Sequence, residues 1–127
     1  MTNDTHLLRQ VNPSWVQAGR ITSQLFRPTP RDNKRSSVYD GDQITAEDSW
    51  SHFTDQLGFQ SVGVMSVTVG ECEEDDLPAE ADPEPFPEHA VIKFDGCGSN
   101  AEIEKKAKKL RNTAVKRGWQ YEAEAGE

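Results

Sequence analysis

The spacing of apolar residues along the chain predicts short strands and two amphipathic helices. Residues 61–72 and 90–94 are rich in β-branched residues and have few polar interruptions, which is typical of strands buried in a sheet. We expect these two strands to be antiparallel neighbours, with Met65, Val67 and Val69 facing one way. Residues alternate in character at 20–26 and at 119–123, which predicts a first strand and a short closing strand.

The first helix is predicted to begin after Thr45. Thr45 and Asp48 form a variant of the capping box that often starts a helix. Apolar residues then follow at spacings of three and four, so they share one face that we expect to join the core: Trp50, Phe53 and Leu57. Gly58 is well placed to end this helix in the left-handed conformation.

The segment 95–119 contains the second helix. Ser99 or Asn100 can cap its start, acidic residues occupy its first turn, basic residues occupy its last turn, and Gly118 follows it. Its buried stripe is predicted to consist of Ile103, Ala107, Leu110 and Ala114.

In chain order these segments read strand, helix, strand, strand, helix, strand. This order predicts a single-domain α+β fold, a ferredoxin-like βαββαβ sandwich in which two helices cover one face of an antiparallel sheet. Another antiparallel α+β sheet with two helices fits the same pattern. A chain of 127 residues is typical of one domain. We place that domain at 20–123, after an N-terminal arm at 1–19 and before a disordered tail at 124–127.

The net charge of −8 comes from one segment. Residues 71–88 hold nine acidic residues and no Lys or Arg, whereas the rest of the chain holds 14 basic and 13 acidic residues. Because this segment is also rich in proline, we expect an extended, mobile acidic loop. We favour simple solvation of this loop and, after that, docking on a basic partner. It could also imitate the charge of a nucleic acid or fold back over the basic second helix.

The sequence also indicates where the protein works. No stretch is apolar over the roughly 18 residues that a membrane helix needs, and the first ten residues lack the pattern of a secretory signal. We therefore expect a cytoplasmic protein that binds no membrane. Its two cysteines, Cys72 and Cys97, are expected to be reduced.

Residues 26–43 are the leading candidate for a binding site. They contain arginines, which hold carboxylate or phosphate groups in a bidentate fashion, and aspartates that could pair with those arginines within the loop. The segment is longer than a minimal connector, and long structured loops often carry function. The contact residues that we predict are Arg27, Arg31, Arg35, Tyr39 and Asp40.

An enzymatic alternative rests on Glu71 and Glu73. A Glu-x-Glu pair after a strand resembles the acidic pair of ADP-ribosyltransferases, which would imply roles for an arginine and a serine such as Arg27 and Ser37. The arginine loop would then hold a nucleotide, as it would in a nucleotide sensor. However, the chain has no phosphate-binding glycine motif, and a pair of acids is expected by chance in so acidic a segment.

The other residues that could bind a metal, act as nucleophiles or bind nucleic acid form less specific patterns. Cys72, His89 and Cys97 lack the close spacing of metal ligands, and neither cysteine lies in a nucleophile motif. We therefore predict no catalytic residue, metal or cofactor, and favour a protein that is not an enzyme. The second helix carries half of the basic residues and could attract nucleic acid, although the overall acidity opposes nonspecific binding.

Four stretches resemble a family of small bacterial proteins described only as hypothetical: RITSQLFRPTP, SVYDGDQITAEDSW, VGVMSVTVGEC and PEPFPEHAVIKF. The resemblance runs from about Leu7 to Tyr121 and implies a bacterial cytoplasmic origin, with no activity, cofactor or binding residues attached. Taken together, the sequence favours an accessory protein that binds another macromolecule, preferably a protein, in the manner of an immunity protein or antitoxin. It predicts no oligomeric state.

Overall fold

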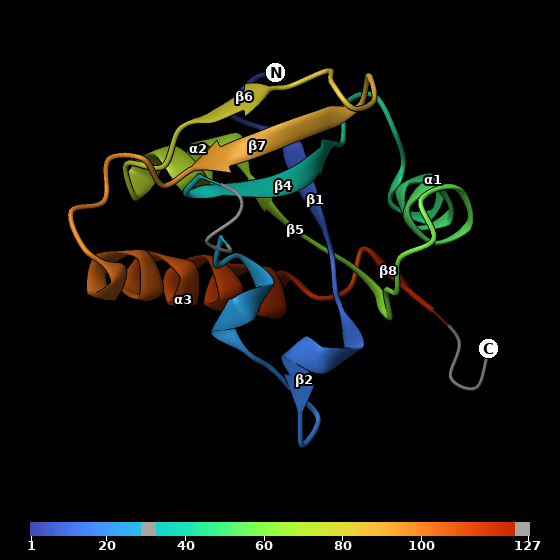
Figure 1. Ribbon diagram of the computed structural model, residues 1–127, viewed down its shortest axis with the longest axis horizontal. Coiled ribbons are helices and arrows are strands. Elements are labelled where there is room, and N and C mark those ends of the chain that lie inside the picture. The colour runs from blue at the N-terminus through green and yellow to red at the C-terminus, as the bar shows by residue number, and fades with distance from the viewer. Residues whose placement is uncertain (29–32, 124–127) are drawn as a thin grey trace.

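The computed structural model describes residues 1–28 and 33–123 (Figure 1). In this part of the chain, six strands form one sheet in the order β6-β7-β4-β1-β5-β8. All the pairings between neighbouring strands are antiparallel. The strands are β1 (His6–Gln10), β4 (Arg35–Asp40), β5 (Gly63–Thr68), β6 (Ala79–Ala81), β7 (His89–Lys93) and β8 (Tyr121–Glu122).

Helices and a small hairpin complete the described structure. The hairpin pairs β2 (Val16–Gln17) with β3 (Arg20–Ile21) and projects from the sheet (Figure 1). The longer helical elements are α1 (Ala46–Ser51), the π-helical turn η4 (His52–Gln56), α2 (Val69–Glu74) and α3 (Asn100–Arg117), and the 3-10 turns are η1 (Pro13–Trp15) and η2 (Ser23–Leu25). The predicted α+β class is therefore confirmed.

The ferredoxin-like arrangement is not confirmed. Helices α1 and α3 lie on opposite sides of β1 and β5, rather than together on one face (Figure 1). The two apolar strands that we expected to be neighbours are also separated. Strand β5 pairs with β1 and β8, whereas β7 pairs with β4 and β6.

Two predictions for the first third of the chain are wrong. Residues 1–19 were expected to form an arm, but β1 lies inside the sheet between β4 and β5. Its adjacent Leu7 and Leu8 point to opposite faces and are both buried, so they produce no alternating pattern. The strand predicted at 20–26 extends over Arg20–Ile21, and the η2 turn then lets the consecutive Leu25 and Phe26 both enter the core.

The predicted starts of both helices are confirmed. The Thr45 side chain accepts a hydrogen bond from the Asp48 backbone N–H at 3.1 Å and caps α1. Ser99 caps α3 in the same way. The residues of α3 that are buried are those of the predicted stripe: Ile103, Ala107, Leu110 and Ala114.

The acidic segment 71–88 is not the extended loop that its composition predicts. Thr68 and Glu71 form a complete capping box that starts α2, and β6 then pairs with β7. The Arg117 guanidinium donates two hydrogen bonds to the Glu71 carboxylate, at 2.9 and 2.7 Å, and Lys109 Nζ lies 3.4 Å from Asp75 Oδ1. The start of the segment therefore contacts the basic helix, and folding back over that helix is one of the alternatives left open by the sequence.

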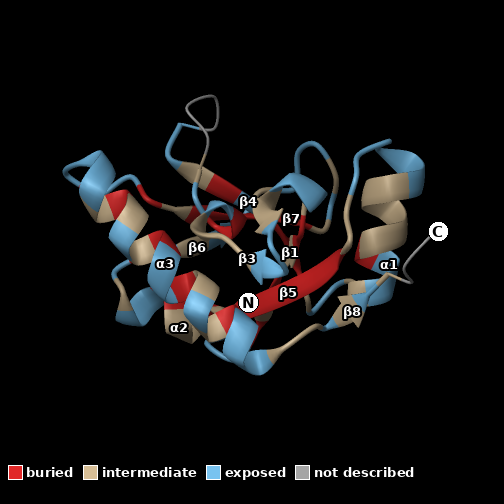
Figure 2. Cartoon of the chain, turned by 90° about the horizontal axis from the view of Figure 1, so that it is seen from below, coloured by how far each residue is buried: buried red, intermediate tan, exposed pale blue. Residues whose placement is uncertain are grey.

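Helices cover both faces of the sheet, and Figure 2 shows buried residues on α3, β4 and β5. On one face, α3, α2 and η2 cover what we call the α3-side core, centred on residues such as Leu7, Phe26, Val67, Ile92 and Leu110. On the other, α1 and η4 cover what we call the α1-side cluster, in which the buried members are Leu8, Tyr39 and Val64. Among the described residues, no helix has the length and apolar character needed to cross a bilayer.

Candidate functional site

The predicted contact residues divide between the surface and the interior. Arg27 is exposed and Arg35 is half-buried, and they form ion pairs with Glu104 at 3.1 Å and with Asp95 at 3.6 Å, respectively. Tyr39 and Asp40 are each only 4% exposed, and Arg31 lies outside the described residues. A binding role for these five residues stays a prediction, but the four described ones do not form one exposed patch.

Strand β4 explains this division, because its six residues, Arg35–Asp40, lie within the segment that we expected to be a loop. Alternate residues of β4, Ser36, Val38 and Asp40, are buried. Because two of these three are polar, the strand lacks the alternation of apolar and polar residues by which a half-buried strand is recognised in a sequence. The Asp40 carboxylate accepts hydrogen bonds at 2.9 Å from the backbone N–H of Asp42 and from Nε2 of Gln43, so it stabilises the turn after β4.

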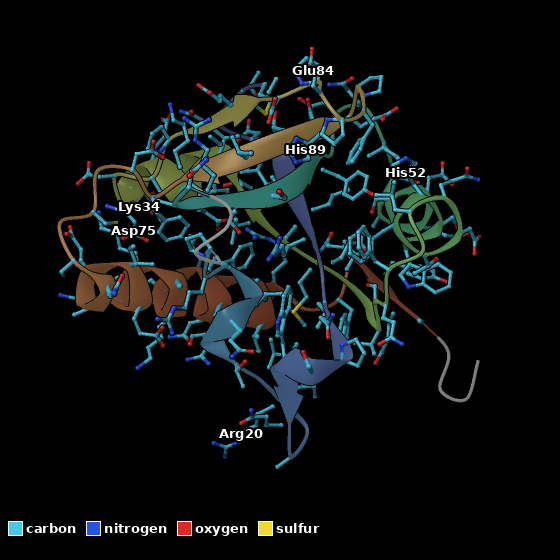
Figure 3. The ribbon with its side chains drawn as sticks, in the orientation of Figure 1. Arg20, Lys34, His52, Asp75, Glu84 and His89 are labelled. Atoms are coloured by element: carbon cyan, nitrogen blue, oxygen red, sulfur yellow. The ribbon has the colours of Figure 1, made fainter. Side chains whose placement is uncertain are left out.

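Tyr39 lies at the centre of an aromatic cluster on the α1 side of the sheet. Its ring stacks on Phe86 with centroids 5.0 Å apart, and Phe86 also contacts the rings of His52 and His89. The Tyr39 hydroxyl lies 2.7 Å from Nδ1 of His52. Burial, together with the Glu88 carboxylate, raises the pKa of Tyr39, so the phenol stays protonated at neutral pH and can donate to His52. Figure 3 shows both histidines on one side of the molecule, with Glu84 on the loop that leads to β7.

A pocket of about 300 Å³ lies beside this cluster, where β1 and β4 diverge. The two strands pair at Leu7–Asp40 and Leu8–Tyr39, and β1 then crosses away from β4 at a steep angle (Figure 1). The Arg9 guanidinium bridges the gap by donating hydrogen bonds to the carbonyls of Leu25 and Ser37, both at 2.6 Å. We call this hollow the β1–β4 pocket.

Aromatic side chains from distant parts of the chain form its walls. Phe53 comes from η4, Phe59 follows η4, and Phe86 precedes β7. The ring centroids of Phe53 and Phe59 are 5.1 Å apart. Leu57 and Phe59 are 39% and 59% exposed, so the lining includes apolar side chains that face water.

The exposure of Leu57 corrects one prediction. We expected Trp50, Phe53 and Leu57 to share a buried face, but Trp50 and Phe53 are half-buried and Leu57 is exposed. The π-helical turn is the reason, because its wider spacing shifts later residues away from the face set by an α-helix. Gly58 then ends the turn with φ of 75°, as predicted.

Gln10 is a buried polar residue of the pocket lining that the sequence did not indicate. It is 5% exposed and lies on the same face of β1 as Leu8. Its Nε2 donates to Ser49 Oγ at 3.0 Å, but its Oε1 accepts no hydrogen bond from any described residue. A buried acceptor without a donor is destabilising by about 1–3 kcal/mol. Because this oxygen is itself buried, it is not open to a group bound in the pocket.

The arginine loop borders a different hollow. Arg27 and Lys34 line a wider pocket of about 720 Å³ at the start of α3, and Figure 3 shows Lys34 far from His52 and His89. The charge of Arg27 is partly neutralised by Glu104. Its lining also includes Pro28 and Asn33, and residues 29–32 lie outside the described part of the chain.

Glu71, one of the two acids of the enzymatic alternative, is held by structural contacts. Burial opposes the ionisation of Glu71, but hydrogen bonds from Arg117 and from the Thr68 backbone outweigh it and lower the pKa of Glu71. Burial raises the pKa of Cys72 to about 12, so this thiol is not a nucleophile at neutral pH. Among the described residues, no three His, Cys, Asp or Glu side chains form a potential metal site.

Comparison with known proteins leaves the structure as the main guide to function. A scan of the sequence against protein-family models finds no match, and searches of the curated proteins and of solved structures find none either.

Proposed function

We propose that this protein binds another protein by taking one large apolar side chain of that partner into the β1–β4 pocket. The observation that carries the proposal is the combination of an aromatic pocket with exposed apolar residues in its lining. Interfaces are commonly stabilised by an anchor side chain that fills a pocket while surrounding contacts exclude water.

The size of the pocket favours a side chain over a larger ligand. Small-molecule sites usually span about 300–1,000 Å³, and the β1–β4 pocket, at about 300 Å³, lies at the lower end. This volume suits a single ring system better than a nucleotide with its sugar and phosphates.

The exposed residues of the lining favour a protein partner. A small molecule inside the pocket would leave much of Phe59 and Leu57 in water, whereas a partner's surface would cover them. Burying apolar surface is the main favourable contribution to protein association, and exposed apolar patches commonly mark interaction sites. The narrower prediction of an immunity or antitoxin-like role stays a prediction.

A capture experiment with matched variants tests the proposal. Tagged wild-type protein, the Phe59→Ser variant and the Val115→Ser variant would each be used to capture partners from the source organism. Val115 is a suitable control, because it is 44% exposed and lies on α3, away from the β1–β4 pocket. We expect a stoichiometric partner that is retained by wild type and Val115→Ser and lost with Phe59→Ser. Equal capture by all three proteins would contradict the proposal, provided that their thermal stabilities agree.

A further inference from the structure

A second hollow lies between the β2–β3 hairpin and the C-terminal half of α3, and we call it the α3–hairpin groove. It has a volume of about 670 Å³ and shares no lining residue with the β1–β4 pocket. Figure 3 shows Arg20 on the projecting hairpin, far from His52 and His89 of the aromatic cluster. The groove is therefore a different surface from the one in the proposed function.

Two side chains held in place by their contacts shape the groove. The Arg111 guanidinium donates to the Ile21 carbonyl at 3.2 Å and to Asn112 Oδ1 at 2.7 Å, so it connects α3 to the hairpin. Trp119 packs on the backbone of Gly63, where a Cβ would lie 2.7 Å from Cζ3 of the ring. The other apolar side chains of the described lining are aliphatic or a thioether: Val16, Ile21, Met65 and Val115. The groove therefore has an apolar floor.

The described lining of the groove contains three cations and no carboxylate: Arg20, Arg111 and Lys116. Arg20 and Lys116 are exposed and Arg111 is half-buried. Elsewhere on α3, basic side chains have acidic partners: Lys106 with Glu102, Lys109 with Asp75, and Arg117 with Glu71. Within the described part of the chain, the three cations of the groove form no such ion pair. A cluster of like charges that is not neutralised attracts an anionic partner.

The composition of the groove favours an acidic peptide over a nucleic acid. Proteins that bind single strands stack successive bases on aromatic side chains, whereas Trp119 is the one aromatic residue in the described lining. The aliphatic floor suits a side chain such as leucine, and Met65 can adapt its shape to an occupant. The net charge of −8 also opposes the approach of a long polyanion.

We infer that the α3–hairpin groove binds an acidic peptide segment of a protein partner, with an apolar side chain on the floor and Asp or Glu carboxylates paired with Arg20, Arg111 and Lys116. Guanidinium groups bind carboxylates in a bidentate fashion, and the apolar side chain excludes water from the floor. This second binding surface goes beyond the proposed function and does not depend on the β1–β4 pocket.

NMR titration of the ¹⁵N-labelled protein with short synthetic peptides tests the inference. The main probe is acetyl-Gly-Asp-Glu-Leu-Glu-Asp-Gly-amide. It is compared with a peptide in which Ser replaces Leu and with a neutral peptide in which Asn and Gln replace the acids. The indole N–H of Trp119 reports on the groove, and the indole signals of Trp15 and Trp50, which lie outside its lining, serve as references.

Two matched double variants complete the experiment. Arg20→Gln/Lys116→Gln removes two cations from the groove. Its control, Lys34→Gln/Lys105→Gln, removes the same charge from exposed positions outside the groove lining.

We expect the main probe to shift the Trp119 indole signal. Wild type and the control variant should agree in Kd within about twofold in 0.15 M salt, which screens charges more than about 8 Å apart. The groove variant should bind at least about fivefold more weakly, because it loses two ion pairs that solvent partly screens. The Ser peptide should bind about tenfold more weakly, because it leaves the apolar floor uncovered. The neutral peptide should also bind more weakly, and its disadvantage should shrink as salt is added.

Several outcomes would overturn the inference. Equal affinities of the groove variant and its control would do so, as would equal binding of the Leu and Ser peptides or a Trp119 signal that millimolar peptide does not shift. Tighter binding of an oligothymidylate with the same charge as the main probe, lost in the groove variant, would indicate a nucleic-acid site instead. A Trp119 signal that changes with protein concentration alone would indicate that a second copy of the chain occupies the groove.

The proposed function is tested separately. None of these substitutions changes a residue of the β1–β4 pocket, so Phe59-dependent capture of a partner would still support that pocket if every acidic peptide failed. Capture that does not depend on Phe59 would reject the proposed function and leave the α3–hairpin groove standing.

Discussion

The two faces of the sheet differ in how completely their helices cover them. Of the described residues, 18 apolar ones are buried in the α3-side core, whereas the α1-side cluster contains three, with partly buried rings around them. Helix α3 has 18 residues and a continuous apolar stripe, whereas α1 has six and passes directly into a π-helical turn. The comparison indicates that the α3 side stabilises the fold, while the α1 side leaves apolar surface available for binding.

The largest effect is expected from a cavity in the α3-side core. Leu110→Ala removes a side chain that is 1% exposed and should lower the free energy of unfolding by about 2–5 kcal/mol. The matched change on the other face, Leu57→Ala, should change it by less than about 0.5 kcal/mol, because Leu57 is exposed. Urea denaturation of both variants checks this prediction. Similar losses for the two variants would show that the faces do not differ as we infer.

A smaller loss of stability is expected when the contact between α2 and α3 is weakened. Glu71→Gln keeps a group that can complete the capping box but loses the charge that pairs with Arg117. At pH 7 the loss should be about 1 kcal/mol, because solvent partly screens the pair.

The pH dependence of this loss has a definite sign. The pKa of Glu71 is lower in the folded protein than in the unfolded chain, so its stabilising contribution is present above the unfolded value. That contribution disappears as the pH falls through the folded pKa. Thermal unfolding of wild type and variant should therefore converge at acidic pH, below about 4. A difference that stays constant across this range would argue against the ion pair as its source.

Tyr39→Phe tests whether the aromatic cluster acts mainly through packing. The variant keeps the ring that stacks on Phe86 but loses the hydrogen bond to His52, which should cost about 1 kcal/mol of stability. Chemical denaturation measures this value. A loss as large as that of Leu110→Ala would show that the α1-side cluster is as important for folding as the α3-side core.

The smallest effect is expected for Lys109→Ala. Lys109 pairs with Asp75 at 3.4 Å, but its side chain is more than half exposed, and such pairs usually contribute less than about 1 kcal/mol. We expect a change below about 0.5 kcal/mol that falls further in 1 M salt. A loss of stability equal to that of Glu71→Gln would show that both contacts between α2 and α3 contribute similarly to the free energy of unfolding.

The elements that could be predicted from the sequence are those in which local signals agree. Helix α3 combines a cap at Ser99, a regular apolar stripe and a following glycine, and each of these signals acts within a few residues. Strand β7 is similarly clear, since His89–Lys93 includes a short apolar run. The β1–β4 pocket could not be predicted, because Gln10, Phe59 and Phe86 come from separate segments with no common spacing.

The sequence by itself determined the α+β class, the caps of α1 and α3, and the residues that α3 buries, because these depend on short-range periodicity and capping. Tertiary structure decided that β1 and β4 lie inside the sheet, that the acidic segment forms α2 beside the basic α3, and that α1 and α3 occupy opposite faces. These outcomes depend on long-range strand pairing and on burial of polar residues such as Ser36 and Asp40. A pattern of local hydrophobicity contains neither kind of information.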